Sequence, residues 1–439
     1  MRRFKDYDDA VSYILQIPRF SAKNDMDATK AFLKIIGEPV AGTVIHVAGT
    51  NGKGSTCAFL NSVYINQNKT TGMFTSPHLL DIRERIRIND EMISRADFLN
   101  CAEYVMQKLD EMKDIKADYH PSFFEFVFFM AARYFSLKKA QVIIYETGLG
   151  GRLDATNSLS KKDVCVITQI GMDHMEYLGD TPELIAGEKA GIIKKGVPVV
   201  CFKGNNECDR IIENRAKELG SDIYLVGKDN ISQVSFNKKN IDFSYKYGYD
   251  KYVMFMVQSY AHYQVYNAAI AIKTLQVLQG DDCVEHESVK RGIAKMTWRG
   301  RMEQIGPNVF VDGGHNEDGI AAFVDSVRDD ECTGKRYLIF SAVNDKRVSQ
   351  ISRMIVLSGL FDSISLCELT GKRASALDEL TKIFKDTIDD TQRCIELRAY
   401  GHVREAYEEE KGKLSENDRL YICGSLYLVS EILALSDKG

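Results

Sequence analysis

The chain has 439 residues, of which 44% are hydrophobic and 27% are charged, a composition typical of a globular protein with two or three domains. Its formal net charge of −5 excludes a general attraction to nucleic acid or to an anionic membrane, so any phosphate site has to be local. We therefore expect small-molecule chemistry, with no nucleic-acid or membrane partner.

The first residues, Met1 to Asp9, contain no apolar core of signal-peptide length, and no uninterrupted apolar run is long enough to span a bilayer. The ten cysteines form no Cys-x-x-Cys pair and are spread along the chain, often inside apolar runs. These features predict a cytoplasmic protein with reduced, buried thiols, in preference to disulfides or a zinc site. We also expect a monomer.

Two helices are predicted before the first strand. Residues 5 to 36 carry apolar side chains at helical spacing, and the pattern ends at Gly37, with Pro39 just beyond. The loop between the two helices, Pro18 to Phe20, is interpreted as a plain connection, with a contact to substrate as the alternative.

A glycine-rich turn, His46 to Thr56, follows the mostly apolar run Val44 to Ala48 and opens a helix-like segment. Such a turn presents several backbone N–H groups to one point, the helix N-terminus adds partial positive charge, and Lys53 adds a full one. The strand, the lysine, the hydroxyls of Ser55 and Thr56 and the helix together favour an ATP site over a glycine turn without a ligand.

The spacing of this turn departs from the common nucleotide-binding pattern, because two residues separate Gly49 from Gly52 and Gly54 stands between Lys53 and Ser55. The order Gly-Thr-Asn-Gly-Lys-Gly-Ser resembles the phosphate loop of the Mur ligase superfamily, and Gly54 resembles its folylpolyglutamate synthase and dihydrofolate synthase branch. The resemblance implies a catalytic Lys53 and ATP contacts by Gly49, Thr50, Asn51, Gly52, Lys53, Gly54, Ser55 and Thr56.

The next predicted strand, Thr70 to Thr75, leads into Ser76-Pro77-His78 and then into the mixed-charge stretch Arg83 to Arg85. A hydroxyl before proline is usually just a turn residue. The Thr-Ser-Pro-His block nevertheless matches the family, in which its serine binds magnesium. The resemblance therefore implies that Ser76 is a metal ligand.

Two helices are predicted at Phe98 to Met112 and at Pro121 to Phe135, and core packing explains most of the strongly apolar second one. Glu125 is the exception, because a carboxylate within an apolar run needs a partner or a ligand. In the family this block borders the pterin pocket. The resemblance implies substrate contacts by Ser122, Phe123, Phe124 and Glu125.

Gln141 to Tyr145 is a nearly unbroken apolar strand that delivers Glu146 to a glycine-rich turn. An acidic residue at the carboxyl end of a buried strand, beside a phosphate loop on a neighbouring strand, indicates a metal ligand, with a capping or salt-bridged glutamate as the alternative. The following Gly-Gly-Arg-Leu-Asp-Ala-Thr-Asn also matches the family. By that resemblance Leu153, Asp154 and Ala155 face the pterin.

Val164 to Thr168 is the next predicted strand, and the run Asp173 to Ile192 after it matches the Mur ligase pattern nearly letter for letter. In that family the histidine, here His174, binds a second magnesium ion. The lysine, here Lys189, is often carbamylated, which requires a deprotonated and shielded amine, and we assign it a catalytic role. Without the resemblance both would be taken for ordinary loop and helix residues.

Val197 to Phe202 and Ile223 to Val226 are predicted strands, and alternating polar and apolar residues between 229 and 260 predict a small antiparallel extension. Asn267 begins an apolar helix. The resemblance implies that its side chain contacts the nucleotide, whereas the residue type alone equally indicates a helix N-cap.

The domain boundary is predicted within residues 295 to 305, which contain the only tryptophan, Trp298, and we divide the chain into residues 1–296 and 297–439. The family usually has proline where Arg299 stands, so this linker is expected to be less rigid. The matched arginine is Arg301, which by resemblance reaches ATP from the second domain.

The second domain begins with the strand Val309 to Val311 and the motif Asp312-Gly313-Gly314-His315-Asn316, in which Glu317 replaces the family's proline. The resemblance places Asp312 at the nucleotide, and we assign His315 a catalytic role. Further strands alternate with helical segments, which predicts a second α/β unit; they are Tyr337–Phe340, Ser363–Leu366, Cys394–Leu397 and Leu420–Cys423. The stretch Asn344 to Lys346 also fits the family.

The predicted fold is therefore a P-loop-type parallel-sheet ATPase domain followed by a smaller Rossmann-like α/β domain. We expect ATP and two Mg²⁺ sites, and the sequence shows no evident base for phosphorylating a hydroxyl. This combination favours activation of a carboxylate to an acyl phosphate, which the amine of L-glutamate then attacks. By resemblance the carboxylate belongs to a folate or to dihydropteroate. The alternatives are another Mur-type ligase acting on a cell-wall precursor and a non-enzymatic, ATP-gated binding module.

Overall fold

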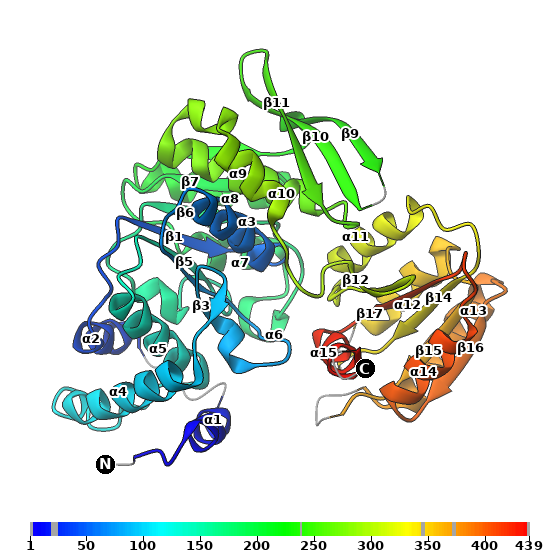
Figure 1. The fold of residues 1–439 in the computed structure, drawn as a ribbon, viewed down its shortest axis with the longest axis horizontal. Helices are drawn as coiled ribbons and strands as arrows, with labels where there is room; N and C mark the ends of the chain where they lie inside the picture. Colours follow the sequence, from blue (N-terminus) through cyan, green and yellow to red (C-terminus); the bar gives the residue numbers. More distant parts are fainter. Residues whose placement is uncertain (1–2, 19–24, 238, 344–346, 371–374, 437–439) are drawn as a thin grey trace.

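The computed structural model describes residues 3–18, 25–237, 239–343, 347–370 and 375–436. Within them the chain forms two α/β domains, each built on a mainly parallel sheet, as predicted (Figure 1). Arg19, Phe20 and the stretch Asn344 to Lys346, which the sequence singled out, lie outside the described residues.

The N-terminal sheet has the order β4-β3-β2-β5-β1-β6-β7-β8, in which the run from β2 to β8 is parallel and β3 and β4 are added antiparallel at one edge. Its strands are β1 (Thr43–Ala48), β2 (Thr71–Phe74), β3 (Ile86–Ile88), β4 (Glu91–Met92), β5 (Val142–Glu146), β6 (Val164–Ile167), β7 (Val199–Phe202) and β8 (Ile223–Val226). The β3–β4 edge was not predicted.

Helices cover both faces of this sheet. One face is covered by α1 (Tyr7–Gln16), α2 (Met26–Ile36), α4 (Arg95–Lys113), α5 (Phe123–Leu137), α7 (Pro182–Ala190) and α8 (Asn206–Glu218). The other face is covered by α3 (Lys53–Asn66), α9 (Gln264–Gln279) and α10 (Glu287–Lys295). Short connections form α6 (Met175–Leu178) and the 3₁₀ turns η1 (Ile82–Arg85), η2 (Ala155–Ser158), η3 (Lys228–Asn230) and η4 (Asp281–Glu285).

The central strands carry unbroken runs of apolar residues because both faces of the sheet are buried. In β5, Ile143 and Tyr145 pack with α5 on one side, whereas Val142 and Ile144 pack with α3 and α9 on the other. Successive side chains of a strand point to opposite faces, so a strand covered twice has no solvent-facing position.

A small antiparallel sheet, ordered β11-β10-β9, confirms the predicted extension between residues 229 and 260. Its strands are β9 (Ile231–Asn237), β10 (Asn240–Gly248) and β11 (Lys251–Gln258). Buried side chains of β10 and β11, among them Phe243 and Phe255, join the core beneath α9 and α10.

The C-terminal sheet has the order β12-β13-β17-β14-β15-β16 and is parallel except for β12. Its elements are β12 (Glu303–Gly306), β13 (Val309–Val311), α11 (Glu317–Arg328), β14 (Arg336–Phe340), α12 (Val348–Ser358), β15 (Ser363–Cys367), α13 (Leu377–Thr391), β16 (Glu396–Tyr400), α14 (Val403–Lys413), β17 (Arg419–Cys423) and α15 (Leu426–Ser436). The strand expected to begin at Cys394 begins two residues later, and β12 was not predicted.

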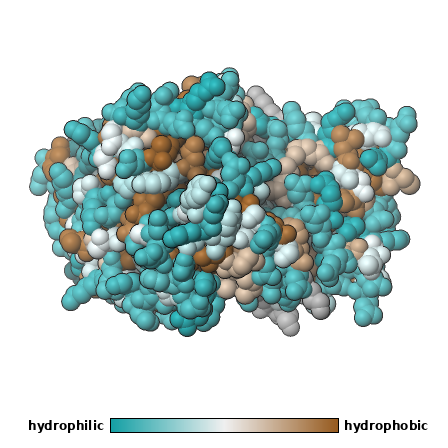
Figure 2. Space-filling model, turned by 90° about the horizontal axis from the view of Figure 1, so that it is seen from above, coloured by the Kyte–Doolittle hydropathy of each residue, from teal (hydrophilic) through white to brown (hydrophobic). Residues whose placement is uncertain are grey.

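All ten cysteines are free thiols, and only Cys332 and Cys394 are not buried. Within the described ranges, no helix is long and apolar enough to cross a bilayer. The face drawn in Figure 2 is mostly hydrophilic, with smaller hydrophobic patches between the polar side chains.

The parallel pairing of β2, β5, β1 and β6 brings four connecting segments to one edge of the sheet. Val47 of β1 pairs with Glu146 of β5, and Ala48 pairs with Ile167 of β6. The phosphate loop, Ser76, Glu146 and the segment after β6 therefore meet at the carboxyl ends of the strands, where open α/β sheets bind ligands.

Candidate active site

Two glycines shape the loop between β1 and α3. Gly49 has φ +149° and Gly52 has φ +88°, conformations that side chains rarely adopt. A Cβ atom would also strike Thr168 at the first position and the Asn267 amide at the second. Glycine is therefore required at these two positions, because the backbone has positive φ there and neighbouring side chains leave no room for a Cβ atom.

The N-terminus of α3 offers unpaired N–H groups. The first helical bond in α3 runs from the Thr56 N–H to the Gly52 carbonyl, at 2.9 Å, so the N–H groups of Lys53, Gly54 and Ser55 precede it. Such groups, together with the helix dipole, form an anion site. The Lys53 ammonium folds over the loop and donates to the carbonyls of Gly49 (2.9 Å) and Thr50 (3.0 Å).

Lys189 lies behind the loop and not in the cavity. Its Nζ donates to the Gly49 carbonyl at 2.8 Å, the same oxygen that Lys53 contacts, and its side chain is buried. Burial, followed by repulsion from Lys53, lowers the pKa of Lys189 to about 7. A substantial fraction of this amine is therefore neutral near neutral pH.

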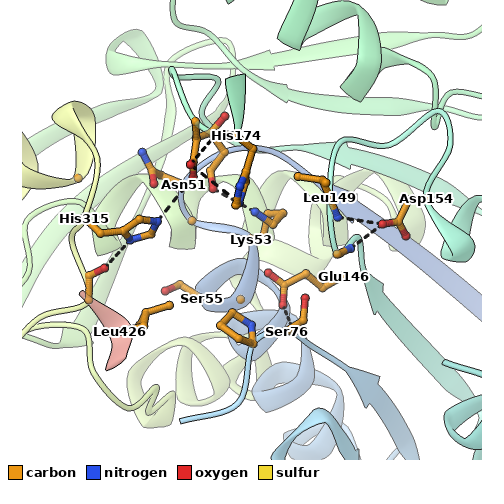
Figure 3. A pocket seen from close by; sticks show the side chains of 18 of the residues that line it. Asn51, Lys53, Ser55, Ser76, Glu146, Leu149, Asp154, His174, His315 and Leu426 are labelled. Atoms are coloured by element: carbon orange, nitrogen blue, oxygen red, sulfur yellow. Dashed lines mark hydrogen bonds and ion pairs between the residues drawn. The ribbon is translucent and has the colours of Figure 1, made fainter. Parts of the chain in front are cut away.

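Ser76 and Glu146 lie together, as the sheet order requires. Glu146 Oε2 accepts the Ser76 backbone N–H at 2.9 Å, and both residues line the cavity beside Lys53 (Figure 3). Burial raises the pKa of Glu146, against the attraction of Lys53 and Arg301.

His174 belongs to a different group, formed with Asp173 and His315. Its Nε2 lies 3.9 Å from Asp173 Oδ1, and His315 Nε2 lies 3.6 Å from Asp173 Oδ2. His315 Nδ1 faces the Gly313 carbonyl at 2.8 Å. Both ring nitrogens of His315 face oxygen acceptors, an arrangement that favours the protonated ring, and despite burial the hydrogen bond to Asp173 raises the pKa of His315.

The two domains meet at the phosphate loop through a pair of amides. Asn51 and Asn316 each donate to the other's side-chain oxygen at 3.1 Å, and Asn316 also donates to Asp173 at 3.4 Å. Asn316 Oδ1 in addition caps α11 by accepting the Gly319 N–H at 2.8 Å. One side chain of the C-terminal domain thus holds both its own helix and the loop of the other domain.

Asn267 is not a helix N-cap, because α9 begins at Gln264 with Tyr263 in the cap position. Its amide lies over Gly52 and donates to Gln264 Oε1 at 2.9 Å. Gln264 in turn donates to the Ser55 hydroxyl at 3.2 Å. The first turn of α9 therefore lies against the first turn of α3.

Arg301 and Asp312 enter the cavity from the C-terminal domain. The Asp312 carboxylate accepts from the Tyr263 hydroxyl (2.5 Å), the Met302 N–H (2.9 Å) and the Gly314 N–H (2.7 Å). Burial raises the pKa of Asp312, and the nearby Arg301 opposes that rise. Asp312 thereby ties the start of α9 to the second domain.

The aromatic end of the cavity is formed at the start of α5. Glu125 accepts the Ser122 N–H (2.8 Å) in a capping box and the Thr29 hydroxyl (3.0 Å), so the buried carboxylate has partners within the protein. Phe123 and Phe124 line the wall, and the Arg85 guanidinium lies 5.1 Å from the centre of the Phe123 ring. This wall suits a flat aromatic ligand.

Asp154 organises the turn after β5. Its carboxylate accepts the backbone N–H groups of Gly148 (2.8 Å), Leu149 (2.9 Å) and Thr156 (3.0 Å), and the Thr156 hydroxyl (2.6 Å). These donors use the whole acceptor capacity of the carboxylate. Its neighbours Leu153 and Ala155 line the cavity beside it.

Most of these groups line one cavity of 1080 Å³, larger than one small ligand requires. Of the candidate residues, those that line it are Thr50, Asn51, Gly52, Lys53, Gly54, Ser55, Ser76, Ser122, Phe123, Phe124, Glu125, Glu146, Leu153, Asp154, Ala155, His174, Asn267, Arg301, Asp312 and His315. Gly49, Thr56 and Lys189 do not. In the described part of the chain, no group of three or more His, Cys, Asp or Glu side chains is arranged to hold a metal.

Four further residues were not assigned from the sequence: Asp173, Tyr263, Gln264 and Asn316. Asp173 and Asn316 stand inside motifs that were recognised, so their neighbours were a usable signal. Tyr263 and Gln264 carried no such signal, because their partners Asp312 and Ser55 lie far away in the chain.

Comparisons with known proteins identify the family of both domains. Residues 127–275 match the Mur ligase middle domain, and residues 300–426 match the glutamate ligase domain of Mur ligases. The dihydrofolate synthase/folylpolyglutamate synthase of Bacillus subtilis is 31% identical over 446 residues, covering 98% of this chain and 99% of the relative.

Solved structures share the whole fold. The folylpolyglutamate synthase of Thermotoga maritima is 26% identical, with a TM-score of 0.81 and coverage of 99% of this chain and 97% of the other. E. coli FolC in complex with DHPP and ADP, at 22% identity, has a TM-score of 0.82 and coverage of 100% and 99%. The latter likeness concerns the fold alone.

Proposed function

The chain belongs to the folylpolyglutamate synthase and dihydrofolate synthase branch of the Mur ligase family, and on that premise we propose how its residues perform the reaction. It is an ATP-dependent ligase that joins glutamate to folates. The observation that carries the residue assignments is one cavity that unites a phosphate loop, a carboxylate–hydroxyl pair and an aromatic wall. The folate names of the relatives favour this substrate over a cell-wall precursor.

We propose that ATP binds with its phosphates on the N–H groups at the start of α3 and with Lys53 beside them. The helix dipole and the ammonium are there to balance the phosphate charge. Asn267, which lies over Gly52, is assigned a nucleotide contact, and Arg301 and Asp312 are assigned contacts from the other side of the cleft.

We propose that Mg²⁺ is held by the Ser76 hydroxyl and the Glu146 carboxylate, with a second ion at His174. Oxygen donors are the ligands that Mg²⁺ prefers, and a cation next to Glu146 relieves the cost of burying this carboxylate. When bound, the ions would neutralise part of the charge on the phosphate oxygens.

We propose that the acceptor's ring system lies against Phe123 and Phe124, bordered by Ser122, Glu125 and residues 153–155. The Bacillus subtilis relative is named for both dihydrofolate and folylpolyglutamate synthesis. We therefore propose that this enzyme accepts dihydropteroate as well as a reduced folate.

The reaction then has two steps. An acceptor carboxylate oxygen attacks the γ-phosphorus, the bond to the β-phosphate oxygen breaks, and an acyl phosphate and ADP result. The amine of L-glutamate attacks the acyl carbon, loses a proton and expels inorganic phosphate, which leaves the amide. His315, in its protonated form, is proposed to hold negative charge at the cleft, and closure of the domains is proposed to exclude water from the acyl phosphate.

We further propose that Lys189 is carbamylated. Its low pKa supplies the neutral amine that reacts with carbon dioxide, and its burial shields the product. The carbamate would place a negative charge behind the loop, where two lysines now share one carbonyl.

We also propose that the enzyme is cytoplasmic, in keeping with its ten free thiols, and that it is a monomer. For the domain boundary we propose residues 296/297, because α10 ends at Lys295 and β12 begins at Glu303.

The test is ADP release by the purified protein with Mg-ATP and glutamate, with dihydropteroate or a reduced folate monoglutamate as acceptor. Release with both means a bifunctional enzyme, and release with only one identifies the substrate and refutes bifunctionality. No release with either, while ATP still binds, would contradict the proposed acceptor site.

A further inference from the structure

The glycine that distinguishes this phosphate loop is explained by the linker between the domains. Gly54 is the second residue of α3 and has an ordinary helical backbone, so its conformation does not require glycine. A Cβ atom there would lie 3.0 Å from Trp298 Nε1 and 3.1 Å from Trp298 Cζ2. A side chain at this position would therefore require the indole to shift by a few tenths of an ångström.

Trp298 is itself held in place on the N-terminal domain. The preceding helix, α10, packs closely on α3, where Gly292 lies against Val63 and its carbonyl accepts the Ser62 hydroxyl at 2.7 Å. On the indole ring, the Arg87 guanidinium lies 5.5 Å from the ring centre. The indole and the phosphate loop thus share one rigid support, α3.

The chain changes direction immediately after Trp298. Gly300 and Met302 both have positive φ, +70° and +47°, and they flank Arg301, which lines the cavity. The Gly300 carbonyl accepts the Gly313 N–H of the second domain at 2.8 Å. Trp298 thus contacts α3 three residues before Arg301, at the point where the chain enters the other domain.

We propose that Trp298 is a positioning residue of the nucleotide site, whose indole sets the place of Gly54 in the phosphate cradle and anchors the linker that carries Arg301. This inference rests on the proposed binding of ATP at the loop. Trp298 acts through Gly54 and Arg301, and it is not assigned a contact with the substrate.

The test uses Gly54→Ala, Trp298→Leu and the double variant. In the parent background Gly54→Ala should lower the melting temperature, because the new methyl group meets the indole. In the Trp298→Leu background it should raise the melting temperature, because alanine stabilises a helix relative to glycine. The KM for ATP should rise roughly tenfold in Gly54→Ala and roughly threefold in Trp298→Leu, and should return to within about threefold of the parent in the double variant. A purely structural role would not produce this rescue.

Gly412→Ala is the matched control, because this helical glycine in α14 has open space around it, with no atom within 4 Å of the point where a Cβ would stand. It should behave identically in both Trp298 backgrounds. The proposal would be overturned if the KM of the double variant rose by the product of the two single effects. It would also be overturned if Gly54→Ala lowered the melting temperature in both Trp298 backgrounds.

Trp298 is the only tryptophan of the chain, so its fluorescence reports on this contact directly. We expect the emission to change when AMPPCP is titrated into the unmodified enzyme, and an unchanged emission at saturation would contradict the coupling. Failure of the nucleotide to bind in calorimetry would instead refute the ATP site, while the melting temperatures would still test the Gly54–Trp298 contact.

Discussion

Replacing Asn316 by serine tests whether the amide pair between the domains keeps water from the acyl phosphate. Asn316 caps α11 and also pairs with Asn51 across the cleft. Serine is an equally good N-cap, but its side chain is too short to reach Asn51. The variant therefore removes this one contact between the domains and leaves the helix end intact.

The magnitude follows from the two hydrogen bonds of the amide pair; the longer bond from Asn316 to Asp173, at 3.4 Å, is lost as well and only adds to the effect. Each bond of the pair is a partly buried, neutral bond of 3.1 Å, and such bonds contribute about 0.5–1.5 kcal/mol each. Their sum, about 1–3 kcal/mol, corresponds to a factor of roughly 5 to 150 in the population of the closed form. We expect the rate of amide formation to fall by at least about fivefold, in line with the lower end of that range.

The assay measures ADP and amide product in the same sample. The parent enzyme should form one ADP for each amide bond, whereas Asn316→Ser should release additional ADP because water hydrolyses the acyl phosphate. Asn205→Ser is the control, since Asn205 caps the distant helix α8 in the same way. An unchanged rate together with an unchanged ratio of ADP to amide would refute the role of the pair.

Three further predictions concern charged groups. Lys53→Ala should abolish ATP turnover while circular dichroism stays native, and substantial remaining turnover would contradict the phosphate cradle. Because the pKa of Lys189 is lowered to about 7, its neutral form increases as pH rises through that value, so a ¹³C-carbamate signal from labelled bicarbonate should grow with pH and be missing in Lys189→Arg. Asp173→Asn should lower the pKa of His315 in an NMR titration, and an unchanged His315 pKa would argue against this pair. The stability that protonated His315 contributes is complete below its ordinary pKa and is lost as pH rises through the raised pKa.

Much of the fold follows from local patterns. The buried strand β5, the glycine turn after β1 and the amphipathic helices at the N-terminus were predicted within a few residues, because hydrophobic periodicity and turn residues act over short distances. The short strands β3, β4 and β12, at or next to the edges of their sheets, were missed, since their pairing with neighbours outweighs a weak local preference.

The candidate site shows the same division. Sequence motifs led to Lys53, Glu146 and His315, which all line the cavity. For Glu125 the sequence left a partner or a ligand open, and for Asn267 a nucleotide contact or a helix N-cap. The partners of Glu125 are Ser122 and Thr29, and Asn267 lies inside the first turn of α9. The type of a residue indicates which kinds of partner or ligand its side chain can bind, whereas its neighbours in the fold decide which of them it contacts.

The sequence by itself therefore determined the helices, the buried strands and the chemistry of the phosphate loop, because these depend on residues close together in the chain. Only the tertiary structure decided which distant groups meet: Asn51 with Asn316, 265 positions apart, and Gly54 with Trp298. The physical reason is that packing and amide pairing across domains depend on the path of the whole backbone, and no local pattern records that path.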